Sequence, residues 1–127
     1  MSLFFRVETA DGVGPYQGTG LINALVTKGV IAWSDMDETY LLDHPTPEND
    51  PVLRFTWQIL KHKEQYIFGF KSLKAVYNWF CLKEEVEWLI ENNFHVSIYE
   101  SDYCFHGKWQ SIMLSGTGVK KGELRVQ

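Results

Sequence analysis

Alternating apolar and polar side chains predict two half-buried strands, one over Leu3–Thr9 and one over Phe94–Ser101. In the first strand, Leu3, Phe5 and Val7 share one face, and Phe4, Arg6 and Glu8 share the other. In the second strand, Phe94, Val96, Ile98 and Glu100 lie together. Both segments are bounded by turn residues, so the pattern indicates strands that each cover one side of a core.

Two further segments are expected to be strands. The continuous apolar run "QYIFGF", Gln65–Phe70, is typical of a strand covered on both faces. Lys108–Leu114 alternates again and places Gln110, Ile112 and Leu114 on one face. Because a turn at His106-Gly107 precedes it, we expect this strand to form a hairpin with Phe94–Ser101 or to lie near it.

Helical spacing of apolar residues predicts a helix from Leu21 to about Gly29, followed by a strand over Val30–Trp33. After the proline-rich segment "DHPTPENDP", Asp50 has the character of an N-cap and Pro51 that of a first helical residue. The inner face of that helix would carry Val52, Phe55, Ile59 and Leu60.

Two more helices are predicted in the middle of the chain. Ser72 would cap a helix that buries Leu73, Val76, Tyr77 and Phe80. A helix starting at Leu82 would bury Val86, Leu89 and Ile90, turn Glu84, Glu85, Glu87 and Glu91 outward, and end at Asn92-Asn93.

These elements together predict an α+β fold with a mixed, mostly antiparallel sheet and a central block of three helices. Strands and helices do not alternate regularly, which argues against a doubly wound sheet. We expect residues 1–115 to form a single domain. The segment 116–127 would be a C-terminal tail, either a short edge strand or flexible.

Composition excludes several classes of function. The net charge is −4, which argues against broad binding to nucleic acid or to anionic membranes. No apolar run approaches the ~20 residues of a membrane span, and the start of the chain lacks the pattern of a signal peptide. With only two cysteines, the expected environment is a reducing cytoplasm.

Familiar catalytic and metal-binding motifs are missing. "GVGPYQGTG" is glycine-rich but lacks the lysine of a phosphate loop, so it is interpreted first as a cluster of turns. Cys104 and His106 are two residues apart, yet the sequence offers no second close pair of ligands. No metal site is therefore expected. His44, next to Pro45, is either a loop residue or a contributor to a binding site.

Arg6 is the most informative charged residue, since a guanidinium in the middle of a strand cannot lose its charge. One interpretation is an ion pair with Glu8, two residues along on the same face. The other is an anion-binding arginine that a strand holds rigidly. In the second case the glycines after the strand would let the backbone approach a ligand closely.

The segments "FFRVE", "GVGPY", "HPTPEND", "FGFKSLKAVYNWF", "VSIYE" and "GKWQSIML", in this order, resemble a family of small phage and bacterial proteins of uncertain function. Their layout is in turn similar to the ADP-ribosyltransferase fold. That resemblance implies NAD as the cofactor, an arginine or histidine on the first strand that binds it, a hydroxyl residue near a central strand, and a catalytic glutamate on a late strand.

Carried onto this sequence, the resemblance makes Arg6 the first-strand residue and Ser72 the hydroxyl residue. Gln110 falls at the position of the catalytic glutamate, and Glu100 is the nearest acidic alternative. A glutamine cannot act as a base, so this departure puts transferase activity in question. Tyr16 or Tyr77 would offer a platform for the nicotinamide ring.

These residues could also have purely structural roles: Ser72 would only cap a helix, Gln110 would be an ordinary strand residue, and Glu100 would pair with Arg6 across the sheet. Two functions therefore stay open. The first is an NAD-binding ADP-ribosyltransferase-like protein, active or degenerate. The second is a non-catalytic phage-type protein that binds and modulates a host protein through an exposed apolar patch, with Trp33, Trp57 and Trp109 as candidates.

Overall fold

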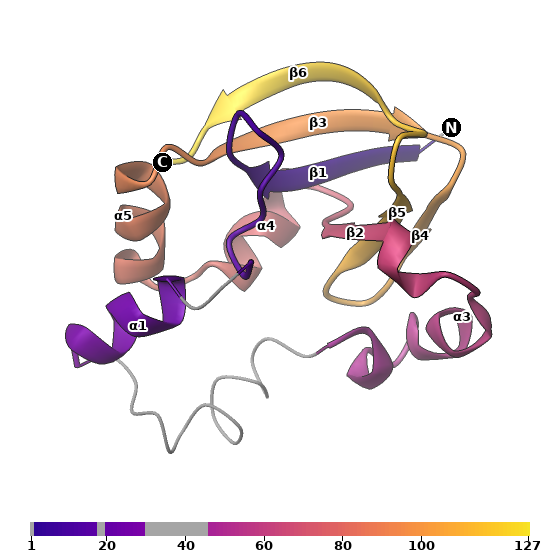
Figure 1. Ribbon diagram of the computed structural model, residues 1–127, viewed down its shortest axis with the longest axis horizontal. Helices are drawn as coiled ribbons and strands as arrows, with labels where there is room; N and C mark the ends of the chain where they lie inside the picture. Colours follow the sequence, from indigo (N-terminus) through magenta and orange to yellow (C-terminus); the bar gives the residue numbers. More distant parts are fainter. Residues whose placement is uncertain (1, 18–19, 30–45) are drawn as a thin grey trace.

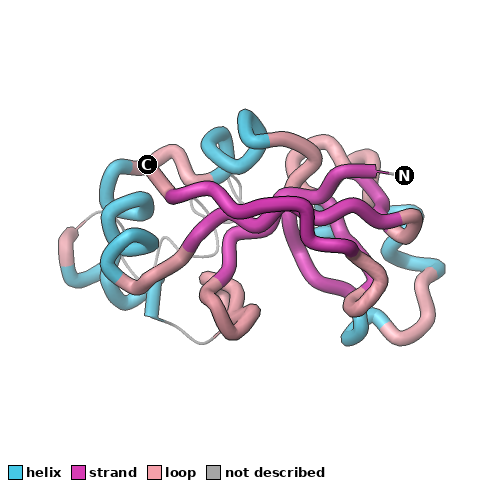
Figure 2. Tube along the Cα trace, turned by 90° about the horizontal axis from the view of Figure 1, so that it is seen from above, coloured by secondary structure: helices cyan, strands magenta, loops and turns pink. Residues whose placement is uncertain are grey.

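A computed structural model describes residues 2–17, 20–29 and 46–127. Their strands form two antiparallel three-stranded sheets, and four α-helices lie beside and below the larger sheet (Figures 1 and 2). The predicted α+β class is confirmed. The single sheet of the prediction is wrong for this part of the chain, because its strands divide into two groups.

The first sheet has the order β1–β3–β6 and combines β1 (Ser2–Glu8), β3 (His95–Ser101) and β6 (Val119–Arg125). The register of β1 and β3 runs without a break from Ser2 opposite Ser101 to Glu8 opposite His95. β6 lies at the edge, so residues of the segment expected as a C-terminal tail form a regular strand. A bulge interrupts its pairing with β3 between Ile98 and Tyr99.

The second sheet has the order β2–β5–β4 and combines β2 (Tyr66–Gly69), β5 (Ser111–Leu114) and β4 (Cys104–His106). An isolated bridge joins it to the first sheet, since Phe5 and Phe70 exchange two backbone hydrogen bonds of 2.7 Å. The expected hairpin between Phe94–Ser101 and Lys108–Leu114 is wrong. β4 intervenes in sequence and takes the place beside β5, while β3 pairs with β1 and β6.

β2 was expected to be covered on both faces, and this prediction is also wrong. β2 is an edge strand, and Phe68 remains half exposed with its ring tilted against that of Trp57. A continuous apolar run is therefore explained here by contact with a neighbouring helix on one side and not by burial between two layers.

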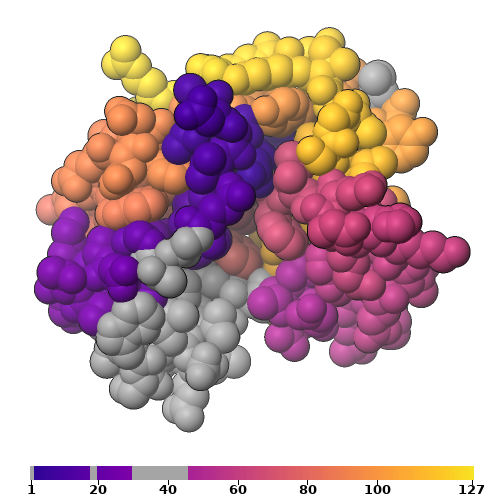
Figure 3. All heavy atoms as spheres, in the orientation of Figure 1, coloured from indigo at the N-terminus to yellow at the C-terminus, as the bar shows by residue number. Residues whose placement is uncertain are grey.

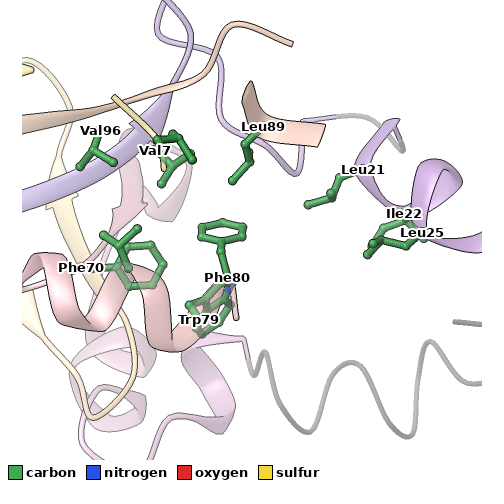
Figure 4. Packing of buried hydrophobic residues seen from close by; sticks show 11 residues of the cluster. Val7, Leu21, Ile22, Leu25, Phe70, Trp79, Phe80, Leu89 and Val96 are labelled. Carbon is green, nitrogen blue, oxygen red and sulfur yellow. The ribbon is translucent and has the colours of Figure 1, made fainter. Parts of the chain in front are cut away.

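The main core lies between the first sheet and the helices α1 (Gly20–Thr27), α4 (Leu73–Trp79) and α5 (Lys83–Glu91). Figure 4 shows Phe80 in the middle of this cluster, close to Trp79 and Leu89. Phe70 contacts both Trp79 and Phe80, with ring centroids 5.6 and 6.1 Å apart. These rings fill the space under Val7 and Val96.

Local signals set the ends of the two central helices. The Ser72 hydroxyl accepts a hydrogen bond from the Ala75 N–H at 3.1 Å, which confirms the predicted cap of α4. α5 ends in a left-handed Asn93, with φ of 63°. The Phe94 N–H then reaches the Leu89 carbonyl and the Asn93 N–H that of Ile90, as in a Schellman ending.

One glutamate of α5 contradicts the expected outward pattern. Glu85 is fully buried, and its Oε1 accepts the Leu82 N–H at 3.2 Å. It lies three residues after Leu82, the N-cap of α5, where a carboxylate reaches back to an otherwise unpaired amide. Ile90, expected to face inward, is half exposed instead.

α3 (Arg54–Ile59) packs on the second sheet in a smaller core made of Leu53, Trp57 and Ile112. The predicted inner face is wrong here, because Val52, Phe55 and Ile59 all point to the exterior. Two short 3₁₀ turns, η3 (Pro47–Asn49) and η4 (Lys63–Gln65), flank this helix. Val30–Trp33, expected as a strand, lies outside the described residues.

None of the helices that the structure describes is long and apolar enough to cross a membrane.

Candidate functional site

Arg6 lies at the centre of a buried polar cluster on one face of the first sheet. Its side chain is 9% exposed, and its Nε forms an ion pair with Glu8 Oε1 at 2.9 Å. Nη1 donates to the Phe68 carbonyl at 2.8 Å, and Nη2 donates to the Gly12 carbonyl at 3.2 Å. The ion pair with Glu8, one of the two interpretations of Arg6, is therefore present in the structure.

The second oxygen of Glu8 is also bound. It accepts a hydrogen bond of 2.5 Å from the hydroxyl of Tyr99 on β3. Burial, together with this carboxylate, raises the pKa of Tyr99 to about 12. The cluster thus holds one cation, one anion and one neutral phenol, and its formal charges balance.

The glycine-rich turn closes over this cluster. Gly12 has a left-handed φ of 81°, which lets the chain reverse between Thr9 and Val13. A Cβ on Gly14 would come within 3.1 Å of Arg6 Nη2. The close approach that glycine permits is therefore an approach to the guanidinium of the protein itself.

Glu100 lies on the opposite face of the same sheet. Leu3 is its register partner on β1, whereas Arg6 is opposite Ser97. Since paired residues share a face and neighbours alternate, Glu100 is on the side of Leu3 and Arg6 is on the other. The expected pairing of Arg6 with Glu100 across the sheet is wrong, and the two do not converge on one site.

Ser72 and Gln110 belong to two elements of the second half of the molecule. The Ser72 hydroxyl caps α4, as the interpretation of Ser72 as a structural cap expects. Gln110 was expected on a late strand but lies in the turn before β5, where its carbonyl accepts the Gly107 N–H at 2.7 Å. Its side chain is buried.

The two candidate tyrosines are far from equivalent. Tyr16 stacks on Phe80 with ring centroids 6.0 Å apart, and its hydroxyl accepts the Trp79 indole N–H at 3.0 Å. Tyr77 accepts the backbone N–H of Gln127 at 3.1 Å. Each ring thus supports the packing around α4. His44 lies outside the described residues.

Asp50 forms a second buried site, which the sequence indicated only as a helix cap. Its Oδ1 accepts the N–H groups of Val52, Leu53 and Lys108 at 2.9–3.1 Å, and its Oδ2 accepts that of Trp109 at 3.0 Å. Burial would raise the pKa of Asp50, but these four hydrogen bonds outweigh it and hold the pKa below its usual value.

The Asp50 carboxylate therefore joins the start of α3 to the turn between β4 and β5. The neighbouring Gly107 is required for this contact, since a Cβ there would lie 2.6 Å from Oδ2. No short sequence motif links residues 50 and 107–109. The signal in the sequence would be an aspartate and a distant turn that contains glycine. Because such turns are common, this signal does not identify the contact.

A shallow hollow of about 60 Å³ lies between this turn and α4. Ala75, Asn78 and Trp79 form one wall, and Lys108 and Trp109 form the other. It is much smaller than the pockets of ~300 Å³ or more that enclose a dinucleotide-sized ligand.

The outward side of α3 carries the other feature that the sequence did not predict. Val52, Phe55 and Ile59 are 58%, 62% and 81% exposed. Their spacing of three and four residues places them on one side of a helical segment. In Figure 3 the surrounding residues project as a separate lobe at the lower right.

Among the residues that the structure describes, no group of three or more metal-ligating side chains comes together. Cys81 and Cys104 are unpaired thiols, and burial raises the pKa of Cys104.

Comparison with known protein families identifies a match over nearly the whole chain. A family model described as "Bacteriophage T4 Y00F protein" matches residues 1–126. No curated protein and no solved structure matches the chain.

Proposed function

Because the chain belongs to the bacteriophage T4 Y00F protein family, we propose that it acts in an infected bacterium as a non-catalytic binding protein. The outward side of α3 and of the turn that precedes it, defined by Val52, Phe55 and Ile59 and called here the α3 face, binds a host protein. The observation that carries this proposal is the exposure of three large apolar side chains at helical spacing.

The α3 face is held in position without a partner. Leu53 and Trp57, on the inner side, are buried against Ile112 of β5. The indole N–H of Trp57 donates to Glu48 at 3.2 Å, and Asp50 fixes the preceding turn. A rigid face loses little conformational entropy on binding, which favours a helix that inserts into a groove.

The charges beside the α3 face indicate the kind of groove. The Arg54 guanidinium lies 4.8 Å from the centroid of the Phe55 ring, and Lys61 and Lys63 follow the helix. An apolar groove with carboxylates at its rim would complement this arrangement. The expected occupant is thus a host protein with an acidic-rimmed hydrophobic groove. This surface differs from the apolar patch around tryptophans that the sequence predicted.

Two of the three tryptophans expected in the patch do not support it. Trp57 is buried, and Trp33 lies outside the described residues. Trp109 is 42% exposed but stands beside α4, where it lines the hollow.

NAD binding by an ADP-ribosyltransferase-like protein stays a prediction, and the geometry supports it less. The charge of Arg6 is balanced by Glu8, and Glu100 lies on the other face of the sheet. The measurement that decides is thermal unfolding with millimolar NAD, which stabilises any native state that binds it. A rise in the melting temperature that Arg6→Ala abolishes would favour the enzyme interpretation.

The α3 proposal is tested with a photo-crosslinking amino acid at position 55. In infected cells it should link the protein to one host protein, which is then purified for affinity measurement. Ile59→Glu should weaken that affinity at least tenfold, because it places a carboxylate in an apolar contact.

Ile90→Glu provides the matched control, since Ile90 is also an exposed isoleucine near the end of a helix. It should leave the affinity unchanged. Crosslinks only between copies of this chain, or equal losses in both variants, would overturn the proposal.

A further inference from the structure

The hollow between α4 and the turn before β5 is formed by residues that the α3 face does not use. Lys108 and Trp109 contribute from the turn, and Ala75, Asn78 and Trp79 contribute from α4. Its walls combine indole rings with an ammonium and an amide, so a ligand there would meet both flat apolar surfaces and polar groups.

This part of the surface is basic although the chain as a whole is acidic. The segments Lys71–Phe80 and Cys104–Leu114 contain three lysines and no aspartate or glutamate, while the net charge of the chain is −4. Within residues 2–17, 20–29 and 46–127, Lys71, Lys74 and Lys108 form no ion pair with a carboxylate.

Two of these lysines lie at the hollow, and the third lies near β4. Lys108 lines the hollow, and Lys74 is one helical turn from Asn78 on the same side of α4. Lys71 is close enough to β4 for its charge, after burial, to lower the pKa of His106. In the described part of the chain these three ammonium groups form no ion pair, and the one carboxylate bound to this turn, that of the buried Asp50, accepts the backbone N–H groups of Lys108 and Trp109.

Trp109 offers an exposed aromatic surface on which a flat ligand could stack. The residue is 42% exposed, and the Lys108 ammonium lies 4.9 Å from the ring centroid. The backbone of both residues is fixed by the two hydrogen bonds to Asp50. A fixed backbone reduces the conformational entropy that these two side chains would lose on binding a ligand.

We propose that this hollow binds a nucleotide, with the base stacked on Trp109 and the phosphate bound by Lys108 and Lys74. Aromatic stacking beside a track of lysines is the usual way in which proteins hold single-stranded nucleic acid. A hollow of about 60 Å³ cannot enclose a base, so the edges of the base stay in water. Binding is therefore tolerant of base identity and strongly salt-dependent.

The site would take either a free nucleotide or one nucleotide of a single strand. The expectation from net charge, that the protein does not bind nucleic acid broadly, is compatible with such a short basic site.

The experiment measures the fluorescence anisotropy of a labelled thymidine 12-mer between about 20 and 200 mM salt. The wild-type protein should bind with an affinity that falls with salt, with a log–log slope of about −1.5 to −2 for two or three phosphate contacts. Trp109→Ala should weaken binding at least fivefold, and Lys74→Gln should reduce the slope by about 0.7.

The matched controls are Tyr103→Ala and Lys121→Gln, which change an exposed aromatic residue and an exposed lysine away from the hollow. Neither should alter the affinity or the slope. Thymidine monophosphate is added as a competitor: displacement at millimolar concentration identifies a free nucleotide as a ligand, and its failure identifies the single strand.

A readout on the wild-type protein guards against a variant that does not fold. The NMR signal of the Trp109 indole N–H should shift on addition of the oligonucleotide, while that of the buried Trp57 should not. Absence of binding at the lowest salt, or binding that Trp109→Ala leaves unchanged in a folded protein, would overturn the proposal. Neither result bears on the α3 face.

Discussion

Glu8 and Asp50 are buried carboxylates in two regions of the molecule, and the protein stabilises their charges in different ways. Glu8 is bound by the side chains of Arg6 and Tyr99, which come from β1 and β3. Asp50 is bound by four backbone N–H groups, from the start of α3 and from the turn before β5.

The two regions differ in whether their charged side chains can be replaced by apolar residues. An ion pair with a side chain can be replaced as a unit by apolar residues of similar size. A carboxylate that satisfies backbone amides has no such replacement, because the amides remain when the side chain changes. Paired substitution in the Arg6 region should therefore remove the penalty of an unpaired charge, although the Phe68 and Gly12 carbonyls and the Tyr99 hydroxyl would lose their partners, whereas the Asp50 region has no side-chain partner that could be replaced with it.

The largest expected effect is that of Arg6→Met, which leaves the buried Glu8 carboxylate without its cation. We expect the free energy of unfolding in urea at pH 7 to fall by roughly 3–5 kcal/mol. The double variant Arg6→Met/Glu8→Leu should recover the part of this loss that comes from the unpaired charge, but not the part that comes from the Phe68 and Gly12 carbonyls, which stay without a donor. If the double variant were less stable than the single one, the ion pair would not be exchangeable, and the comparison would fail.

Asp50→Ala should cost about 3 kcal/mol in the same measurement, since four amides lose their acceptor. Asp50→Asn keeps one acceptor oxygen and should lie between the wild type and Asp50→Ala. The wild type should also lose stability as the pH falls below about 4, because the folded state has the lower pKa for this group and so binds the proton less readily than the unfolded state.

That acid-dependent loss should be smaller in Asp50→Asn. Identical acid profiles for the two proteins would show that the Asp50 carboxylate is not stabilised by the amides in the way described.

Gly107→Ala should cost about 2–3 kcal/mol, because the new methyl group would lie 2.6 Å from Asp50 Oδ2 and 2.7 Å from the Gln110 carbonyl. Gly122→Ala on β6 is the matched control, since a methyl group added there would have nothing within 4 Å. The control should change the stability by less than about 1 kcal/mol. Equal effects would remove the case for a steric requirement at the Asp50 site.

The smallest effect is expected at alkaline pH and belongs to the Arg6 region. Tyr99 keeps its proton to a pKa of about 12 in the folded protein, whereas 10.0 is the ordinary value. Between these two values the unfolded chain binds fewer protons than the folded one, so stability should fall as the pH rises from about 10 to 12.

Tyr99→Phe should lack this part of the alkaline loss and cost about 1–2 kcal/mol at pH 7. Tyr103→Phe, which changes an exposed tyrosine, should keep the wild-type profile. A Tyr99→Phe protein with an unchanged alkaline slope would contradict the hydrogen bond to Glu8.

Features set by neighbouring residues could be predicted from the sequence. The cap at Ser72 and the left-handed Asn93 depend on residues within a few positions, and both are confirmed. Asp50 accepts the N–H groups of Val52 and Leu53 as an N-cap would, but α3 begins only at Arg54, so the expected helix start at Pro51 is wrong. The strand β1 is present, but its burial does not follow the expected alternation: Leu3 is exposed, and Phe4, Arg6 and Glu8 on the other face are buried together with Val7. The ion pair between Arg6 and Glu8 was one of the two stated interpretations, because both residues lie on one strand face.

Features set by distant residues could not be predicted. The side of α3 that faces inward was assigned wrongly because both of its sides carry large apolar residues, and only contact with β5 decides between them. The partner of each strand depends on contacts across the chain, so the expected hairpin was replaced by pairing with β1 and β6. Asp50 reaches Trp109 for the same reason.

The central position of β3 has a consequence for how the molecule assembles. Its two neighbours are drawn from segments at either end of the sequence, with Ser2 opposite Ser101 on one side and Val119 opposite Glu100 on the other. The chain between β1 and β3 must lose conformational entropy before these strands can form their backbone hydrogen bonds. Folding is therefore expected to take milliseconds to seconds. Until then, the helices and the small sheet must rely on contacts of their own.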